Sequence, residues 1–324
     1  MKLASVKVAG RDLVQNEEPA WTRLGRYGHV NLLVTAGQVI LWAALLTLMD
    51  SDFLHWGLRA AALIVFCLMM QGVFTMLHEF CHRNAHRDSR LNYLIGWTAS
   101  TLFGTAPTLL QVQHWGHHRR NRTESERVEF IHDDEVAWVK WSSYYFSILG
   151  GIWLGCLLFP LVVPFLPFSA AKRLGSDPKY NTFAAGFNDF TAREWRRMRW
   201  EGVVCHLCWG GLALFGPWRA QTLIIAYAAF GFTWSSLQWI YHLYTPIHVV
   251  EGAYNLRLPL PVRLLFLNFN YNLTHHRQPS LPWQELYANS DQAHTQPLWY
   301  RYLRVFLPPR RFPEDVSSLE KRFF

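Results

Sequence analysis

The sequence predicts that residues 1–324 form a single all-α integral membrane domain. We expect about four transmembrane helices, re-entrant or interfacial helices, and a cytoplasmic His-rich helical cap. Half of the residues are hydrophobic and only 17% are charged, against roughly 25% in soluble domains. The apolar residues gather in runs near the ~20 residues that cross a bilayer. Sixteen Trp favour the membrane interface, and the net charge of +8 suits anionic lipid headgroups better than nucleic acid.

The first third of the chain is predicted to form an arm followed by a pair of spans. Residues 1–27 hold five basic side chains and lack the apolar core of a signal peptide, which indicates a cytoplasmic arm. The apolar runs near 29–49 and 56–77 are expected to cross the membrane out and back. Residues 91–112 are only moderately apolar and contain Thr, Ser, Gly and Pro, so we expect an interfacial or re-entrant helix there.

The rest of the chain is predicted to form a second pair of spans and the cap. Residues 143–168 are apolar but broken by Gly and Pro, which favours a re-entrant segment or a short hairpin. Residues 169–200 carry seven basic and three acidic side chains, which places them in the cytoplasm. The runs near 202–216 and 219–241, separated by Gly-Pro-Trp-Arg, are expected to cross out and back. Residues 242–324 then form the cytoplasmic cap and tail.

Histidine residues gather in three clusters, each expected at the cytoplasmic end of an apolar run. The clusters are HEFCHRNAH from His78 to His86, HWGHH from His114 to His118, and NLTHH ending at His276. Spacings of three and four residues place such side chains on one helix face. Neutral imidazole is a common ligand of iron, zinc and copper. One zinc ion needs only three or four ligands, so eight or more converging His residues predict two metal ions.

Two other classes of protein fit parts of this pattern. HEFCH matches H-E-x-x-H, the signature of zinc peptidases, in which Glu79 would be the general base. A peptidase would need one further ligand, however, and would leave HWGHH and NLTHH unexplained. A metal transporter or sensor should place its polar residues within the spans, whereas these His residues lie at the ends. Both classes remain as remote alternatives.

The three clusters, in this order and around two membrane hairpins, resemble the histidine boxes of the membrane fatty acid desaturase and hydroxylase superfamily. Its pattern is HxxxH or HxxxxH followed by two HxxHH boxes, and the resemblance covers about residues 30–290. It implies iron ligands at His78, His82, His114, His117, His118, His275 and His276. It also implies an eighth ligand, His242, four residues after Gln238 at the end of the last span. The third box begins with Asn272, so the ninth ligand is left open between Asn272, His86 and His248.

The resemblance implies a non-haem di-iron oxidoreductase that uses O₂ to introduce a double bond into a fatty acyl chain. The alternative is a hydroxylase, monooxygenase or ketolase of the same superfamily that acts on an alkane, a free fatty acid or a carotenoid. We expect a bacterial inner-membrane protein whose boxes face the cytoplasm. Nearby carboxylates such as Glu79, Asp88, Asp133 and Asp134 are candidates to fix the imidazole tautomers.

The electrons are expected to come from a separate protein of the ferredoxin or cytochrome type. The sequence shows no haem-binding domain, no ferredoxin-like cysteine set and no GxGxxG motif. Arg119, Arg120 and Arg122, beside the second box, are either a docking surface for an acidic donor or ordinary positive-inside residues.

Overall fold

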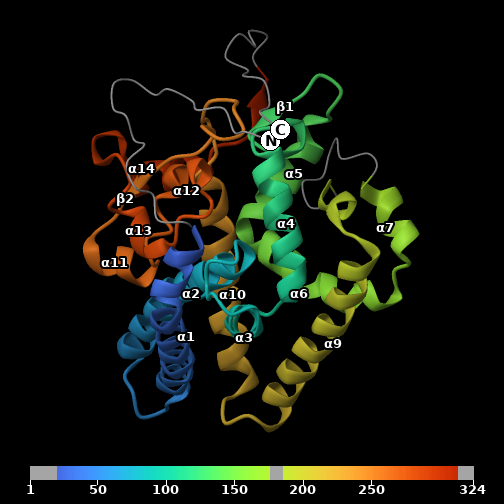
Figure 1. Ribbon diagram of the computed structural model, residues 1–324. Helices are drawn as coiled ribbons and strands as arrows, with labels where there is room; N and C mark the ends of the chain where they lie inside the picture. The colour runs from blue at the N-terminus through green and yellow to red at the C-terminus, as the bar shows by residue number, and fades with distance from the viewer. Residues whose placement is uncertain (1–19, 176–184, 313–324) are drawn as a thin grey trace.

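The long helices of the chain run to one end of the molecule, and a cap of short helices covers the other end (Figure 1). The computed structural model describes residues 20–175 and 185–312, with side chains from Tyr27 onward. The long helices are α1 (Ala20–Asp50), α2 (Trp56–Cys81), α9 (Ala192–Phe215) and α10 (Ala220–Ile240). The predicted all-α membrane fold is confirmed by this arrangement and by four helical segments that are long and apolar enough to cross a membrane.

The four candidate spans are not the four that the sequence predicts. They are Tyr27–Asp50, Trp56–Cys81, Ala137–Phe165 and Ala220–Ile240. The expected span at 202–216 is only the second half of α9, whose first half contains the basic stretch REWRRMRW. Because those charges lower its hydropathy, α9 is not among the candidates found in the described residues. The segment 137–165 takes its place in the set.

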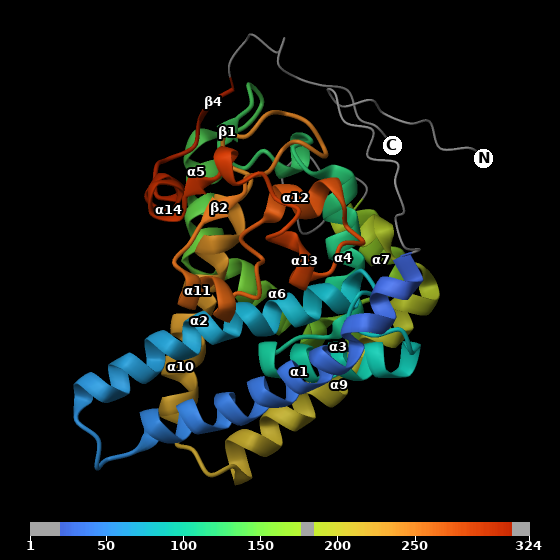
Figure 2. The same ribbon diagram turned by 60° about the vertical axis from the view of Figure 1, so that its left-hand side comes forward.

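Although α9 is less apolar, it also runs to the end remote from the cap (Figures 1 and 2), and the turn that follows it contacts the end of α1 and the turn between α1 and α2. Arg219, which follows α9, forms ion pairs with Asp50 at 3.1 Å and with Asp52 at 2.9 Å. The Trp218 indole N–H donates to Thr47 Oγ1 over 3.0 Å. The two helical hairpins are therefore joined at their turns.

The segment predicted to be re-entrant or a hairpin, residues 143–168, lies mostly in one kinked helical run. This run comprises α5 (Ala137–Phe146), the π-helical turn η2 (Ser147–Gly151), α6 (Ile152–Val162) and the 3₁₀ turn η3 (Val163–Phe165). The kink is at Gly150, whose φ of 124° is accessible mainly to glycine. Next to it, the backbone N–H of Trp153 donates to Ser235 Oγ on α10 over 3.1 Å. The side-chain hydroxyl thus satisfies a donor near the break, as a membrane environment requires.

Residues 91–112 lie in two helices rather than one, α3 (Ser89–Phe103) and α4 (Pro107–Arg120). Gly104, with a φ of 90°, ends α3, and Pro107 begins α4. The Thr108 backbone N–H and hydroxyl both donate to the buried Glu201 carboxylate on α9, each over 2.8 Å. A carboxylate at a helix N-terminus is stabilising, so Glu201 fixes the start of the helix that carries HWGHH.

The cap is built from short helices and two two-stranded parallel sheets. Its elements are η1 (Glu124–Glu126), β1 (Phe130–Ile131), α7 (Phe168–Gly175), η5 (Gly186–Asp189), β2 (Leu256–Arg257), α11 (Leu260–Leu265), α12 (Asn272–Arg277), α13 (Trp283–Leu286), η6 (Gln292–His294), β3 (Gln296–Pro297), α14 (Leu298–Val305) and β4 (Arg310–Arg311). Strand β1 pairs with β4, and β2 pairs with β3. The main hydrophobic core lies between α1, α2, α3 and α10, and includes the fully buried Phe66, Met70, Phe103 and Phe230.

Candidate metal centre

Four segments bring their His residues to one place between the bundle and the cap. The last turn of α2 carries His78, and His82 is its C-cap residue, after which the positive φ of Arg83 (62°) ends the helix. Helix α4 carries the second box and α12 the third, while His242 follows the end of α10. The spacing of three or four residues aims the rings of each helix in one direction.

Five imidazoles form the larger of two groups. It contains His78, His82, His114, His118 and His275, whose ligand atoms all lie within 4.8 Å of one another. The Nε2 atoms of His82 and His114 are 2.6 Å apart, and those of His114 and His118 are 3.0 Å apart. His275 Nε2 lies 3.0 Å from both His118 Nε2 and His78 Nε2. Five ring nitrogens thus converge on one point.

Hydrogen bonds between the rings do not account for this convergence. A ring nitrogen carries either one N–H or one in-plane lone pair, so it forms one good hydrogen bond. The Nε2 atoms of His114, His118 and His275 each have two ring nitrogens as neighbours. A cation at the centre would give every nitrogen a partner, so the donor set fits a metal ion.

The second group contains three imidazoles, His117, His242 and His276. Their ring centroids are 4.8 to 5.2 Å apart. His117 Nδ1 lies 2.6 Å from the Glu126 carboxylate, and His242 Nδ1 lies 2.9 Å from the Gly252 carbonyl oxygen. Both partners are acceptors, so each ring carries its proton on Nδ1 and keeps the Nε2 lone pair for a metal.

Burial keeps six of these rings in the neutral form that binds metals. Desolvation lowers the pKa of His82 to about 3. It also lowers the pKa of His114, His118, His242, His275 and His276 well below the usual range, and neighbouring imidazoles add to the effect. A protonated ring would lose its hydration and be repelled by the other rings. The lone pairs of these six rings are therefore available near neutral pH.

The two groups adjoin each other. The rings of His118 and His276, one from each group, have centroids 4.6 Å apart, and those of His114 and His117 are 6.0 Å apart. Together the groups contain all eight His residues that the family pattern marks. The structure therefore contains two neighbouring groups that could each hold a metal ion, one with five imidazoles and one with three.

His86 and His248, the two doubtful His candidates, lie outside both groups. His86 Nδ1 accepts from the Asp88 backbone N–H over 2.9 Å, and its ring packs edge-on against His29. His248 Nδ1 accepts from the backbone N–H groups of Val250 and Glu251. In each residue this ring nitrogen shapes the local loop.

Asn272, Gln238 and Glu79 lie beside the two groups. Asn272 and Gln238 line the same cavity as His117 and His242. The buried Asn272 Oδ1 has no hydrogen-bond partner among the described residues. The Gln238 amide donates to the Trp234 carbonyl over 3.3 Å. The buried Glu79 carboxylate lies 3.9 Å from His78 Nδ1.

Glu126, whose carboxylate lies 2.6 Å from the candidate ligand His117, was not predicted from the sequence. Glu126 lies nine residues after His117, a separation that places the two side chains on no common helix face. They meet because the chain turns back between α4 and η1. By contrast, Asp88 contacts the backbone N–H groups of Arg90 and Leu91 at the start of α3.

The basic residues beside the second box are not all available for docking. Arg122 and Glu129 form an ion pair at 2.7 Å in which both side chains are only 1% exposed. Arg120 pairs with Asp189, and only Arg119, which contacts the same carboxylate, is substantially exposed. Of the two interpretations left open by the sequence, a docking surface is not available at Arg122 and scarcely at Arg120, because the fold holds both against acidic residues.

Replacing Glu126 by Gln is expected to weaken metal binding by about 10- to 100-fold, the usual effect of losing such an orienting carboxylate. The change removes the charge that holds the His117 proton on Nδ1. Chelator competition on the purified protein would measure the affinity. Glu124→Gln makes the same change of charge two residues away and should bind metal normally. Equal affinities of the two variants would contradict the role of Glu126.

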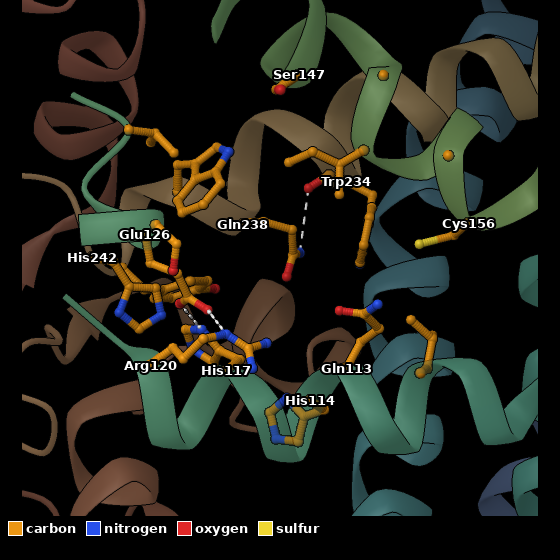
Figure 3. Close-up of a pocket in the computed structure, with 18 of the residues that line it drawn as sticks. Gln113, His114, His117, Arg120, Glu126, Ser147, Cys156, Trp234, Gln238 and His242 are labelled. Atoms are coloured by element: carbon orange, nitrogen blue, oxygen red, sulfur yellow. Dashed lines mark hydrogen bonds and ion pairs between the residues drawn. The ribbon is translucent and has the colours of Figure 1, made fainter. Parts of the chain in front are cut away.

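A cavity of about 500 Å³ opens on the imidazoles (Figure 3). One side is apolar and includes Leu110, Ile152 and Cys156, while His114, His117, Gln238 and His242 lie on its wall. The size and mixed lining are those of a small-molecule site.

Aromatic rings pack closely around the cavity beside the larger group. The ring of Phe269 lies 5.1 Å from that of His78, and Phe74 lies 5.3 Å from Phe269 and 5.1 Å from Trp234. All three contacts are edge-to-face, the arrangement that aromatic rings prefer. These rings form an aromatic wall, defined by Phe74, Trp234 and Phe269, beneath the imidazoles.

The fold and the site together define a helical membrane protein with a His-rich cluster that is suited to metal binding. Five imidazoles around His78 and His82 exceed the three protein ligands of a catalytic zinc site. A family model described as fatty acid desaturase matches residues 54–308. The chain belongs to this family, which confirms the resemblance found in its histidine boxes. No curated protein matches the chain.

Family membership makes the protein a desaturase/hydroxylase-like membrane oxidoreductase that acts on a lipid. The apolar helices and the His cluster agree with this class.

Proposed function

We propose that the protein is an O₂-dependent di-iron desaturase that introduces a double bond into a fatty acyl chain. The observation that supports this most is the pair of adjoining imidazole groups beside a largely apolar cavity. Imidazole suits iron, and an apolar cavity suits a chain of methylenes.

The five-ring group would hold one iron ion and the three-ring group a second, with Asn272 Oδ1 at the ninth position. When bound, two ferrous ions supply the activation of O₂ and the oxidising power that protein side chains lack. Glu126 and the Gly252 carbonyl hold protons on the Nδ1 atoms of His117 and His242. The aromatic wall excludes water and holds the acyl chain against the site.

The proposed reaction removes two hydrogens from adjacent methylenes and reduces O₂ to two molecules of water. The substrate supplies two electrons and two protons, and two further electrons and two protons come from outside. An external donor of the ferredoxin or cytochrome type would deliver the electrons. We place the imidazoles on the cytoplasmic side of a bacterial inner membrane, because the basic residues of 169–200 favour that side.

Expression in a heterologous host, followed by mass spectrometry of total lipids and free hydrocarbons, tests this function. New double bonds that depend on O₂ and on the intact His residues are the expected result. An added oxygen without unsaturation would overturn the proposal in favour of a hydroxylase, monooxygenase or ketolase.

Replacing Gly155 by Leu is expected to shift the products toward shorter acyl chains. Gly155 lines the cavity, and a Cβ built there meets no atom within 4 Å. A larger side chain can therefore fill part of the cavity without a clash. Since one methylene in an apolar pocket changes kcat/KM by about 10- to 200-fold, the longest substrate should lose at least roughly tenfold. The chain lengths of the products would be measured by mass spectrometry.

Gly37→Leu is the matched control for this experiment. A Cβ at Gly37, on α1, also meets open space, but Gly37 does not line the cavity. The control should keep the normal product distribution. An identical distribution from both variants would show that the chain does not occupy the cavity near Gly155.

A further inference from the structure

Two short helices of the cap, α11 and α14, expose rows of apolar side chains. On α14 and just beyond it, Trp299 is 66% exposed, Leu303 63% and Leu307 49%. Residues four apart lie on one face of a helix. Leu260 and Leu264 on α11 have the same spacing and are 56% and 54% exposed. Contiguous apolar rows of this kind mark interaction surfaces.

Helix α14 packs beside α10 near the end of α10 that faces the metal centre. The hydroxyl oxygens of Tyr302 and Ser236 are 3.0 Å apart, and the rings of Phe306 and Phe232 lie 6.5 Å apart. Ser236 and Phe232 precede Ile240 by four and eight residues, which places them about 6 and 12 Å inward along the helix. α14 thus lies beside the last turns of α10 (Figure 2), near the end at which this candidate span would leave the bilayer.

Helix α11 lies at a similar level beside α2. The Thr75 hydroxyl donates to the Phe266 carbonyl oxygen over 2.9 Å. A Cβ on Gly72 would lie 2.2 Å from the Leu265 carbonyl oxygen, so this contact requires glycine. Thr75 and Gly72 precede Cys81 by six and nine residues, or about 9 and 14 Å. The 26 residues of α2 span about 39 Å, roughly 9 Å more than a hydrocarbon core, so α11 lies near the membrane surface.

The remaining flank of α14 is cationic. The guanidinium carbon of Arg301 lies 3.7 Å above the Tyr254 ring, and that of Arg304 lies 4.8 Å from the Tyr244 ring centroid. Arg304 follows Tyr302 by two residues, which turns it about 200° around the helix from the side that contacts α10. An apolar face with basic residues on the other flank is the pattern of a helix that lies in a membrane interface.

We propose that α11 and α14 form a lipid-docking surface that lies in the leaflet on the side of the metal centre. The surface consists of Leu260, Leu264, Trp299, Leu303 and Leu307, and its occupant is the bilayer. Arg301 and Arg304 lie at the level of anionic headgroups, which attract basic residues near a membrane. The sequence predicts that residues 242–324 form a cytoplasmic cap and tail. On this proposal, part of that segment lies in the membrane interface instead.

The surface is continuous with a candidate span. The Trp141 indole N–H, on α5, donates to the Pro309 carbonyl oxygen over 3.0 Å. The hydroxyl of Tyr145 donates to the carbonyl oxygen of Phe306 over 3.1 Å. Trp138 and Phe146 on α5 are themselves 69% and 62% exposed. The lipid-facing side of α5 therefore extends onto the end of α14.

Spin labels on the full-length protein test the proposal, whatever reaction the protein catalyses. In a Cys208→Ser background, which removes the exposed cysteine, Leu303→Cys, Leu264→Cys and His294→Cys are labelled with a nitroxide. The variants are placed in phosphatidylcholine–phosphatidylglycerol nanodiscs. Collision with O₂, which is enriched in hydrocarbon, is compared with collision with a water-soluble nickel chelate. His294 is 83% exposed on the same cap and is the aqueous control.

The ratio of O₂ to nickel accessibility at 303 and 264 is expected to exceed that at 294 several-fold. Ratios equal to that at 294 would overturn the membrane contact, as would spin–spin coupling between two copies at 303. Trp299→Cys gives a further position if Leu303→Cys fails to fold. Replacing phosphatidylglycerol by phosphatidylcholine should lower the ratio at 303, and an unchanged ratio would overturn the contact with anionic headgroups.

Discussion

Replacing His118 by Ala is expected to abolish turnover and to release iron from the protein. His118 Nε2 lies 3.0 Å from the Nε2 atoms of both His114 and His275, so it belongs to the centre of the five-ring group. Its ring also lies 4.6 Å from that of His276 in the second group. The variant therefore removes a candidate ligand at the junction of the two imidazole groups. Iron per chain, measured by atomic emission, and product, measured by mass spectrometry, should fall together.

His276→Ala, which removes a ring of the second group, is also expected to release iron and to abolish turnover. His294→Ala is the matched control, because His294 is exposed and lies outside both groups. His86→Ala should also retain iron and activity, since its ring packs against His29 instead. Turnover that persists in either His118→Ala or His276→Ala would refute a shared metal centre.

Replacing Arg122 by Met is expected to destabilise the protein by roughly 3–5 kcal/mol, the cost of leaving one member of a buried ion pair alone. Arg122 and Glu129 are 2.7 Å apart and 1% exposed. Glu129 also accepts from the Tyr244 backbone N–H, and Arg122 donates to the Thr245 carbonyl oxygen. The pair therefore joins the segment after α4 to the segment after α10. Thermal unfolding in nanodiscs should show a lower Tm, and the metal position at His242 should bind more weakly.

A second substitution separates the effect of the charge from that of packing. Arg122→Met combined with Glu129→Leu removes both charges, and apolar replacement of a whole buried pair is often close to neutral. The double variant should therefore unfold at a higher temperature than Arg122→Met alone. A double variant that is no more stable than the single variant would show that packing, rather than the unpaired carboxylate, causes the loss.

The candidate ligands were predictable because their positions follow local rules. A spacing of three or four residues on a helix aligns His114, His117 and His118 whatever the rest of the chain does. The pairing of His117 with Glu126 depends instead on a turn of the chain that no residue spacing encodes. The ion pair of Arg122 with Glu129 is similar, since burial turned an apparently surface-exposed charge into an internal one.

The fold class was likewise predictable from the apolar runs. Which segments form the candidate membrane spans was not. Segment 137–165 contains Gly150 and two prolines, which obscure the helical pattern in the sequence, and the nearby Ser235 hydroxyl compensates the break in the helix. α9 begins with basic residues, so its apolar half is shorter than a full span. In both segments, contacts with neighbouring helices decide whether the segment joins the bundle. A local sequence pattern does not contain these contacts.

In the proposed reaction, the aromatic wall beneath the imidazoles bears on how one carbon of an acyl chain is chosen for oxidation. The methylenes of a saturated chain are chemically nearly alike, so reactivity alone cannot distinguish them. Phe74, Trp234 and Phe269 are held edge-to-face by one another and by neighbouring rings, which makes the wall stiff. When one end of an acyl chain rests against a stiff wall, each carbon lies at a fixed distance from that wall. The carbon that reacts is the one whose distance from the wall equals the distance between the wall and the imidazoles. Regioselectivity in the proposed desaturation then depends on length, and substitutions that move the wall should move the new double bond.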